Sequence, residues 1–269
     1  MRKCELTAKR LGVEMSILEQ EAHLRAWFTQ DADPILQTID GLDIGWGGVQ
    51  RWATARMPAP AGPHLDFACG YGTFLAQLGW RFPGARLVGL NIDYAGPHAM
   101  IGELLTQAGV RAILVQADAR EMPFPDGAFV SASCFLGLQD IEIGFGQAGV
   151  RATVSEAARV LQAGGTLTLL DEFPLEGFAA LLEGLPLVVV DRAERALDVH
   201  WDRQVAERAI ALYAKGWVAQ ARPSDAEEED RVYAEAHRRM ETEMQRQLQD
   251  RGYYVPFGPV RMITVRKGG

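Results

Sequence analysis

A stretch of acidic, small and glycine residues, HLDFACGYGTF at positions 64–74, has the composition of a ligand-binding turn. An apolar segment that carries Asp66 leads into Gly70 and Gly72, and because glycine has no Cβ the backbone there can turn sharply and approach a ligand closely. An ordinary strand-to-helix turn would look the same, since a lone Gly-x-Gly is a weak signal. A dinucleotide fingerprint would need a third glycine at position 75, where the chain has Leu75. The stretch is therefore a candidate ligand site. Leu75 weakens the case for a nicotinamide-dependent dehydrogenase.

Polar residues also follow the next apolar segments of the chain. LVGLNID ends at Asp93, AILVQADA contains Asp118, and RVLQAGG follows a further apolar segment and a helical pattern. Each signal is weak alone, but their order and spacing together are strong. Since ligands of open α/β sheets bind at the carboxyl ends of the strands, we expect these residues to lie near the turn at 64–74.

Apolar segments that alternate with helical patterns predict an α/β fold with a mostly parallel sheet. Runs such as LVGL, AILV, LTLL and LVVV suit strands that are buried on both faces. The predicted strands are 64–68, 86–91, 112–116, 128–135, 165–172, 185–190 and 259–266. The predicted helices are 73–82, 96–108, 148–162, 203–217 and 227–250.

Two helical regions flank this alternating core. Residues 1–60 form a predicted helical extension or lid, with an approximate apolar stripe over 14–30 and a glycine-rich segment at 40–48. Residues 61–269 form the main domain, in which 192–253 is a predicted helical insert before the last strand. We expect this insert to cap the strand ends and to wall a pocket for an organic substrate. Its helices could equally seal the insert onto the sheet or mediate a homodimer.

Composition and charge disfavour several other classes of protein. The chain has 48% hydrophobic and 23% charged residues, an ordinary globular mixture, and its net charge of −8 without a Lys/Arg cluster disfavours nucleic acid as a partner. No apolar run approaches the ~18–20 residues of a membrane helix, and no secretory leader is visible. Cys4, Cys69 and Cys134 are too far apart in sequence for a disulfide framework or a metal site. We therefore expect a cytoplasmic protein that uses no metal and no membrane partner.

Taken in order, the motifs resemble those of the class I S-adenosylmethionine-dependent methyltransferases, in particular the small-molecule group that includes ubiquinone and menaquinone C-methyltransferases. The family pattern is LDxGCGxG, then VxGxD, ADAxxLPFPDxxFDxV and RVLxPGGxL, and the resemblance covers residues 64–172, less than half of the chain. It implies a Rossmann-like, doubly wound sheet of seven mostly parallel strands. It also implies S-adenosylmethionine as the methyl donor, S-adenosylhomocysteine as the product and a small organic molecule as the acceptor.

The resemblance further implies how the first motif would bind the donor. Gly70 and Gly72, with the neighbouring Ala68 and Cys69, would line the methionine part, and Asp66 would bind its ammonium group directly or through water. Ala68 stands in place of the first glycine of the motif, which adds one methyl group near the ligand.

The next two motifs would bind the nucleoside. Asn91, followed by Ile92 as a further contact, falls at the position of the acid that binds the ribose. An amide accepts only through its oxygen, so Asp93, two residues on, could take over that role. Asp118 and Ala119 would hold the adenine amino group and ring.

Methyl transfer needs an in-line nucleophile in a dry pocket, and it needs a base only where the acceptor carries a proton. The candidate bases are Tyr94 after the second strand, Glu172 at the end of the fifth strand and His200 in the insert. Each has a structural alternative, because Tyr94 could pack, Glu172 could cap a helix and His200 could be an ordinary surface or core residue.

Four further residues are candidates for covering the donor or binding the acceptor. Trp46, in a glycine-rich loop, could cover the donor sulfonium or anchor the N-terminal helices. Gln139, Trp201 and Tyr213 are candidate acceptor contacts. The sequence thus predicts a small-molecule methyltransferase whose methylated atom is open. A nicotinamide-dependent oxidoreductase and a non-catalytic nucleotide-binding scaffold are the alternatives.

Overall fold

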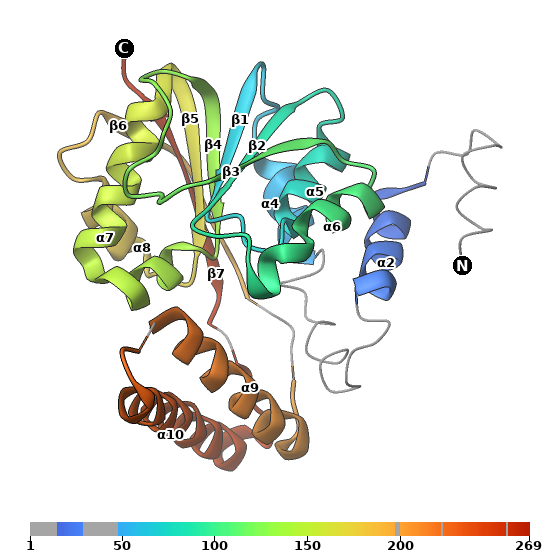
Figure 1. The fold of residues 1–269 in the computed structure, drawn as a ribbon, viewed down its shortest axis with the longest axis vertical. Helices are drawn as coiled ribbons and strands as arrows, with labels where there is room; N and C mark the ends of the chain where they lie inside the picture. Colours follow the sequence, from blue (N-terminus) through green and yellow to red (C-terminus); the bar gives the residue numbers. More distant parts are fainter. Residues whose placement is uncertain (1–14, 29–47, 197–199, 222, 257) are drawn as a thin grey trace.

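The computed structural model describes residues 15–28, 48–196, 200–221, 223–256 and 258–269, and its centre is one twisted sheet (Figure 1). Seven strands pair in the order β3-β2-β1-β4-β5-β7-β6. In that order the strands are β3 (Ala112–Gln116), β2 (Arg86–Asn91), β1 (Pro63–Phe67), β4 (Phe129–Phe135), β5 (Leu161–Asp171), β7 (Val260–Lys267) and β6 (Leu187–Arg195). The pairs among β1 to β5 are all parallel, and β7 runs antiparallel to both of its neighbours. The predicted Rossmann-like, mostly parallel seven-stranded sheet is confirmed.

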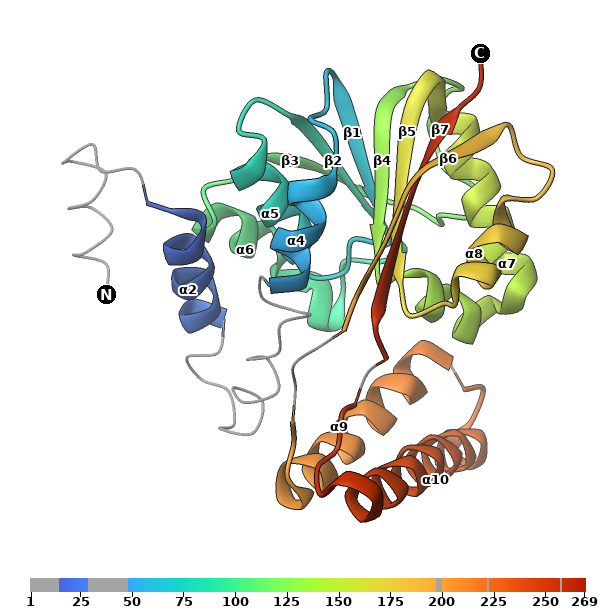
Figure 2. The same cartoon turned by 180° about the vertical axis from the view of Figure 1, so that it is seen from behind.

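Helices cover both faces of the sheet and enclose two apolar cores (Figures 1 and 2). The first face carries α4 (Gly48–Arg56), α5 (Thr73–Arg81), and α6 (Ile101–Gln107) with the short helix η1 (Gly96–Met100). The second face carries α7 (Leu138–Val160) and α8 (Leu175–Leu182). The runs LVGL in β2 and LTLL in β5 are mostly buried, as predicted. The prediction was wrong for AILV in β3 and LVVV in β6, because these strands form the two edges of the sheet and leave Ile113, Val188 and Val190 exposed.

The N-terminal helix α2 (Ile17–Phe28) joins the first face through a buried polar contact. Glu21 accepts a hydrogen bond from Gln77 on α5 at 2.6 Å and forms an ion pair with Arg51 on α4. Helix α2 lies within the apolar stripe at 14–30. Helix α4 was not predicted, because its sequence GVQRWATAR shows little apolar periodicity and follows directly on a run of glycines. Most of that glycine-rich segment lies outside the described residues.

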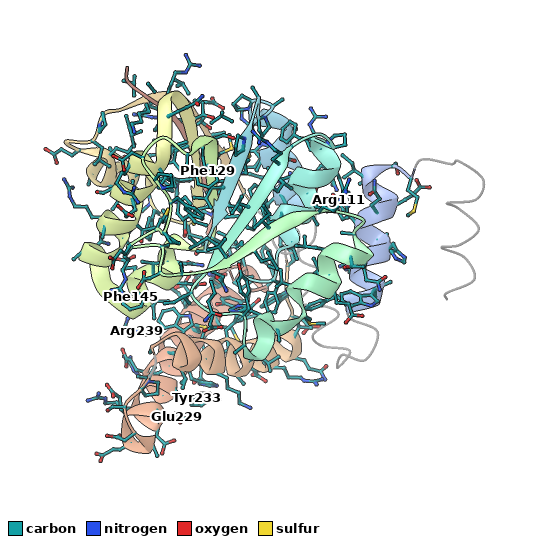
Figure 3. The ribbon with its side chains drawn as sticks, turned by 45° about the horizontal axis from the view of Figure 1, so that its top comes forward. Arg111, Phe129, Phe145, Glu229, Tyr233 and Arg239 are labelled. Atoms are coloured by element: carbon teal, nitrogen blue, oxygen red, sulfur yellow. The ribbon has the colours of Figure 1, made fainter. Side chains whose placement is uncertain are left out.

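The chain leaves the sheet after β6 and returns at β7, and between them α9 (Arg203–Ala221) and α10 (Ala226–Arg251) form a hairpin. Since β6 runs in the same direction as β5, the hairpin emerges where the parallel strands end, and Figures 1 and 2 show it beyond that edge. Asp225 caps α10 by accepting from the Glu228 amide at 2.9 Å. The first turns of α10, with Glu229 and Tyr233, lie away from the strands (Figure 3). The two insert helices agree closely with the predicted ones.

Three elements differ clearly from their predicted bounds, and a fourth, α8, was not predicted. Helix α7 begins at Leu138 rather than 148, with a non-helical residue at Gly146 (φ 65°) where the pattern is interrupted. Helix α8 is a short apolar helix that the sequence pattern did not separate from the adjoining strands. Strand β5 begins at Leu161, four residues early, and β6 continues to Arg195 because an edge strand tolerates alternating polar side chains. Within the described part of the chain, no helix combines the length and apolar character needed to cross a membrane.

Candidate functional site

The turn between β1 and α5 has an unusual backbone, as the glycines of this stretch predict. Ala68, Gly70 and Gly72 all have positive φ, of 52°, 50° and 80°. A Cβ on Gly72 would lie 2.7 Å from Ile101, whereas a Cβ on Gly70 would meet nothing within 4 Å. Gly72 is therefore required for packing, and Gly70 leaves open space beside the turn. Ala68 holds a conformation that favours glycine, which is the residue the motif has at that position.

Asp66 lies at the base of this turn with an incompletely paired carboxylate. The side chain is 1% exposed, and its Oδ1 accepts a hydrogen bond from Ser133 on β4 at 2.7 Å. Its Oδ2 is buried and accepts none from the described residues. Burial raises the pKa of Asp66 to about 7, and the bond from Ser133 opposes that rise. A buried carboxylate oxygen without a donor is costly, so this position suits a cationic ligand group.

Asn91, the last residue of β2, has a fixed amide. Its Nδ2 donates to the Asp93 carbonyl at 2.8 Å and lies 3.3 Å from His98 Nδ1. These contacts engage the donor side of the amide, so Oδ1 is the atom left to accept from a ligand hydroxyl. Asp93 lies beyond the end of β2, where strand alternation no longer applies, and its carboxylate accepts from the Ala95 amide at 3.3 Å. Ile92 occupies the bend between Asn91 and Asp93.

After β3, Asp118 is held by a residue that sequence reasoning did not single out. The Asp118 carboxylate accepts from Arg120 Nε at 3.0 Å and from Nη2 at 2.6 Å. The same guanidinium lies 3.5 Å from the centre of the Phe145 ring on α7. Ala119, between the two charged residues, is buried. The only sequence signal for this pair was an arginine two residues after the motif aspartate.

The RVLQAGG motif supports the site from a distance. Arg159, at the end of α7, donates to the carbonyls of Met122 and Phe124 at 3.0 and 2.8 Å. It also forms ion pairs with Asp126 and Glu156 at 2.7 Å. Arg159 thus fixes the segment that follows Asp118, and its guanidinium is engaged in these contacts.

Two acidic residues end β5 at the edge facing the insert. Asp171 accepts from the backbone amides of Leu138 and Gln139 at 3.0 and 3.2 Å, and so caps α7. Glu172 has a buried Oε1 without a hydrogen-bond partner among the described residues. Burial and the charge of Asp171 raise the pKa of Glu172 to about 7, against the lowering effect of Arg261. Glu172 is therefore a group that can exchange a proton near neutral pH, while Asp171 is structural.

The predicted bases differ in their surroundings. The Tyr94 hydroxyl donates to the carbonyls of Gly89 and Val115 at 3.0 and 3.3 Å, and burial raises its pKa further above the usual value. This arrangement favours packing over proton transfer. His200 is exposed and lies against the Tyr253 ring, with 4.0 Å between ring centres.

The predicted acceptor contacts fall into two places. Trp201 is 4% exposed, stacks near Tyr213 with ring centres 6.4 Å apart, and pairs through its backbone with Tyr254. Gln139 is in the first turn of α7. Trp46 lies outside the described residues.

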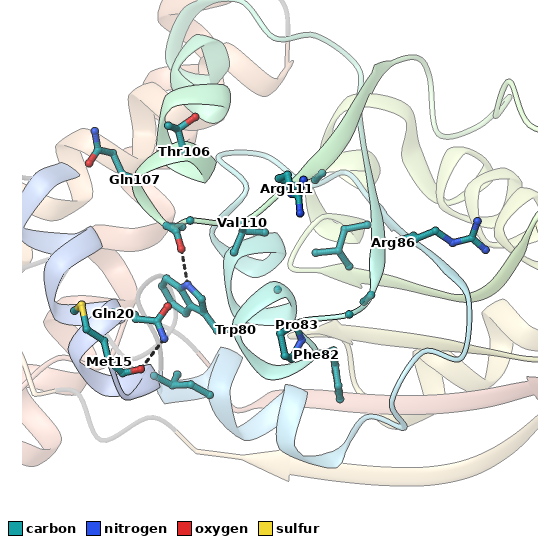
Figure 4. A pocket seen from close by; sticks show the side chains of 18 of the residues that line it. Met15, Gln20, Trp80, Phe82, Pro83, Arg86, Thr106, Gln107, Val110 and Arg111 are labelled. Carbon is teal, nitrogen blue, oxygen red and sulfur yellow. Dashed lines mark hydrogen bonds between the residues drawn. The ribbon is translucent and has the colours of Figure 1, made fainter. Parts of the chain in front are cut away.

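A separate surface hollow lies at the opposite end of the strands (Figure 4). It is bordered by Met15 just before α2, Trp80 near the end of α5, and Arg86 and Ile113 at the starts of β2 and β3. It is thus distinct from the ends of the strands, where Asp66, Asn91 and Asp118 gather.

Comparison with known proteins identifies this arrangement. Residues 65–165 match a family model described as a methyltransferase domain. A demethylmenaquinone methyltransferase from Thermus thermophilus is 37% identical over 135 residues, which are 50% of this chain and 56% of that protein. The chain spans about half the length of the curated relatives it matches.

Two solved structures support the same fold. The YcgJ protein of Bacillus subtilis aligns with 82% of this chain and 98% of its own, with a TM-score of 0.53 and 15% identity. A phosphoethanolamine N-methyltransferase from Haemonchus contortus, solved with S-adenosylhomocysteine, aligns with 91% of this chain and 60% of its own, with a TM-score of 0.52 and 12% identity. The chain therefore contains a methyltransferase domain of class I, the S-adenosylmethionine-dependent family.

Proposed function

We propose that this protein transfers a methyl group from S-adenosylmethionine to a small organic acceptor. The observation that carries the proposal is the buried Asp66 carboxylate, whose Oδ2 has no donor among the described residues and lies beside the turn that Gly70 leaves open. The ammonium group of the donor would supply the missing partner. The family match over 65–165 supports the same donor.

The other strand ends would hold the remaining parts of the donor. Asn91 Oδ1 would accept from a ribose hydroxyl, because Asp93 and His98 engage its Nδ2. Asp118 and Ala119 would contact the adenine. Ala68, Cys69 and Gly72 would shape the turn around the methionine part, with Ile92 beside the ribose. When bound, the donor supplies an activated methyl group, and the protein has to orient it and exclude water.

The acceptor would lie between the strand ends and the insert. We propose residues 192–253 as its cap, with Trp201 and Tyr213 as an apolar wall and Gln139 as a hydrogen-bonding contact. Glu172 is the base best suited to remove a proton from the acceptor, because its buried, unpaired oxygen has a pKa near 7. His200 is the second candidate.

The acceptor itself is best sought among the substrates of the relatives. Three of them are named demethylmenaquinone methyltransferases, which makes demethylmenaquinone the first compound to test. The methylated atom is open. The cytoplasmic location, the absence of a nucleic-acid partner and the homodimer stay predictions.

The donor is tested directly by thermal shift and calorimetry with S-adenosylmethionine, S-adenosylhomocysteine, NAD⁺ and NADH. A ligand at 100 times its dissociation constant stabilises a fold by about 2.7 kcal/mol, or a few degrees in a domain of this size. We expect shifts with the two sulfur nucleotides only. A shift with a nicotinamide alone would replace the methyltransferase by an oxidoreductase. Transfer of labelled methyl groups to demethylmenaquinone then tests the acceptor.

A further inference from the structure

A continuous chain of hydrogen bonds runs from the interior of the sheet to Asp66. His64 on β1 lies between two serines on β4, with its Nδ1 2.8 Å from Ser131 Oγ and its Nε2 2.9 Å from Ser133 Oγ. Ser133 Oγ in turn lies 2.7 Å from Asp66 Oδ1. The strand register explains the contact, since His64 pairs with Ser131 and Asp66 pairs with Ser133.

The chemistry of the four groups gives the chain a direction. An ionised carboxylate can only accept, so the Ser133 hydroxyl must donate its hydrogen to Asp66. Ser133 Oγ then accepts from His64, which requires the hydrogen of the neutral ring to be on Nε2. Nδ1 is left as an acceptor, and Ser131 donates to it. Burial lowers the pKa of His64 to about 3, in agreement with a neutral ring.

The four side chains are sealed from water, which strengthens the effect of each bond. Their exposed fractions are 0% for His64, 5% for Ser131, 0% for Ser133 and 1% for Asp66. In such surroundings aligned hydrogen bonds polarise one another. All of the donors point toward Asp66 Oδ1, so the chain favours the ionised carboxylate and restrains its rotation. Oδ2 is the oxygen to which no residue in the described part of the chain donates.

We propose that His64, Ser131 and Ser133 are positioning residues for the methyl donor, which favour the ionised form of Asp66 and orient it so that Oδ2 accepts from the donor ammonium group. This rests on the proposed function. The competing explanation is that the chain only ties β1 to β4 and has no effect on ligand binding.

Two ligands separate these explanations. S-adenosylhomocysteine carries the amino acid part, whereas 5′-methylthioadenosine has the same nucleoside and sulfur without it. The test variant is Ser133→Ala. The control is Thr264→Val, which removes a buried hydroxyl from the Thr168–Thr264 contact, 3.3 Å long, between β5 and β7. By calorimetry we expect Ser133→Ala to weaken S-adenosylhomocysteine by about tenfold and to leave 5′-methylthioadenosine unchanged. The control variant should bind both ligands as the wild type does.

The outcomes distinguish the two levels of proposal. If the wild type binds S-adenosylhomocysteine but Ser133→Ala loses affinity equally for both ligands, or for neither, the positioning role alone would be overturned. A wild type that binds neither ligand would overturn the donor site and the positioning role together. Nitrogen-15 NMR of His64 in the wild type gives a test that does not depend on the variants folding. At pH 8.5, where Asp66 is ionised, we expect the neutral Nε2–H tautomer, and finding the Nδ1–H tautomer there would reverse the chain and refute the proposal.

Discussion

Arg120 and Asp118 form a two-pronged ion pair at the carboxyl end of β3, with Nε and Nη2 of the guanidinium 3.0 and 2.6 Å from the two carboxylate oxygens. The pair is about one-third exposed, with side-chain exposures of 35% for Arg120 and 34% for Asp118. A carboxylate has about four acceptor positions, so Asp118 can keep Arg120 and still accept from an adenine amino group. Under the proposed function, the ion pair would orient Asp118 for the donor instead of blocking it.

Replacement of Asp118 by alanine should therefore weaken donor binding with little cost in stability. We expect a loss of affinity for S-adenosylhomocysteine of about tenfold or more, because a hydrogen bond to a charged group is lost. The free energy of unfolding should change by no more than about 1 kcal/mol, since partly exposed ion pairs contribute little. Calorimetry and urea denaturation measure the two effects. Glu121→Ala, an exposed carboxylate in the same segment, is the control that should bind normally. Unchanged affinity in a folded Asp118→Ala protein would contradict the adenine assignment.

The two glycines of the turn should respond differently to substitution. Gly70→Ala meets no atom within 4 Å, so its cost is that of an L-residue at φ 50°, roughly 1–2 kcal/mol. Gly72→Ala has a similar backbone cost at φ 80°, and its Cβ would also lie 2.7 Å from Ile101. We expect the second variant to be less stable by about 1–3 kcal/mol more in urea denaturation. Gly70→Val should fold and lose donor binding, because its side chain enters the open space. Normal donor binding by this variant would place the ligand elsewhere.

Much of the fold follows from local sequence patterns. The apolar runs in β2 and β5 are buried strands, and the turn after β1 needs the positive φ that Gly70 and Gly72 allow. The elements that were missed depend on partners far away in sequence. The first turns of α7 are capped by Asp171, 33 residues from Leu138, and no local pattern announces such a cap.

In the candidate site, too, some features could be predicted from local sequence and others depend on distant residues. The motif residues at the strand ends could be read from their order, but their partners could not. His64 and Ser133 are 69 residues apart, and only the pairing of β1 with β4 brings them within 2.9 Å. Glu172 was a candidate from its place after a strand, whereas the burial of its Oε1 without a partner among the described residues could not be read from local sequence.

In the protein without ligand, Asp66 should lower the free energy of unfolding as the pH rises from about 4 to about 7. Its pKa is raised from 3.8 to about 7 by burial. Below pH 4 the carboxyl is protonated in both states and contributes nothing. As the pH rises toward 7, the unfolded chain releases the proton and the folded protein keeps it, so the folded state is progressively disfavoured, by up to about 1.4 kcal/mol per pH unit. Above pH 7 the effect is constant.

Asp66→Asn isolates this contribution from that of other groups. His64 acts in the opposite direction, because its pKa is lowered to about 3 and it destabilises the fold as the pH falls below its usual value of 6.5. We expect the asparagine variant to lose less stability than the wild type between pH 5 and pH 7.5, as measured by urea denaturation. Parallel profiles for the two proteins would show that Asp66 does not titrate in this range.

Glu172→Gln should separate methyl transfer from donor binding. Glutamine keeps the size of the side chain and removes its ability to accept a proton, so we expect transfer to an acceptor that must lose a proton to fall by about 10²-fold or more. Affinity for S-adenosylhomocysteine should be unchanged, and stability at pH 8 should be equal or higher, because the buried charge responsible for the raised pKa is gone. Glu194→Gln is the matched control, since Glu194 also interacts with Arg261, at 2.7 Å, but its side chain is 50% exposed. Labelled-methyl transfer at saturating donor and calorimetry measure the two quantities. Full activity in Glu172→Gln would leave His200 as the candidate base, whereas a loss shared equally with Glu194→Gln would assign the effect to Arg261 and the packing of β7.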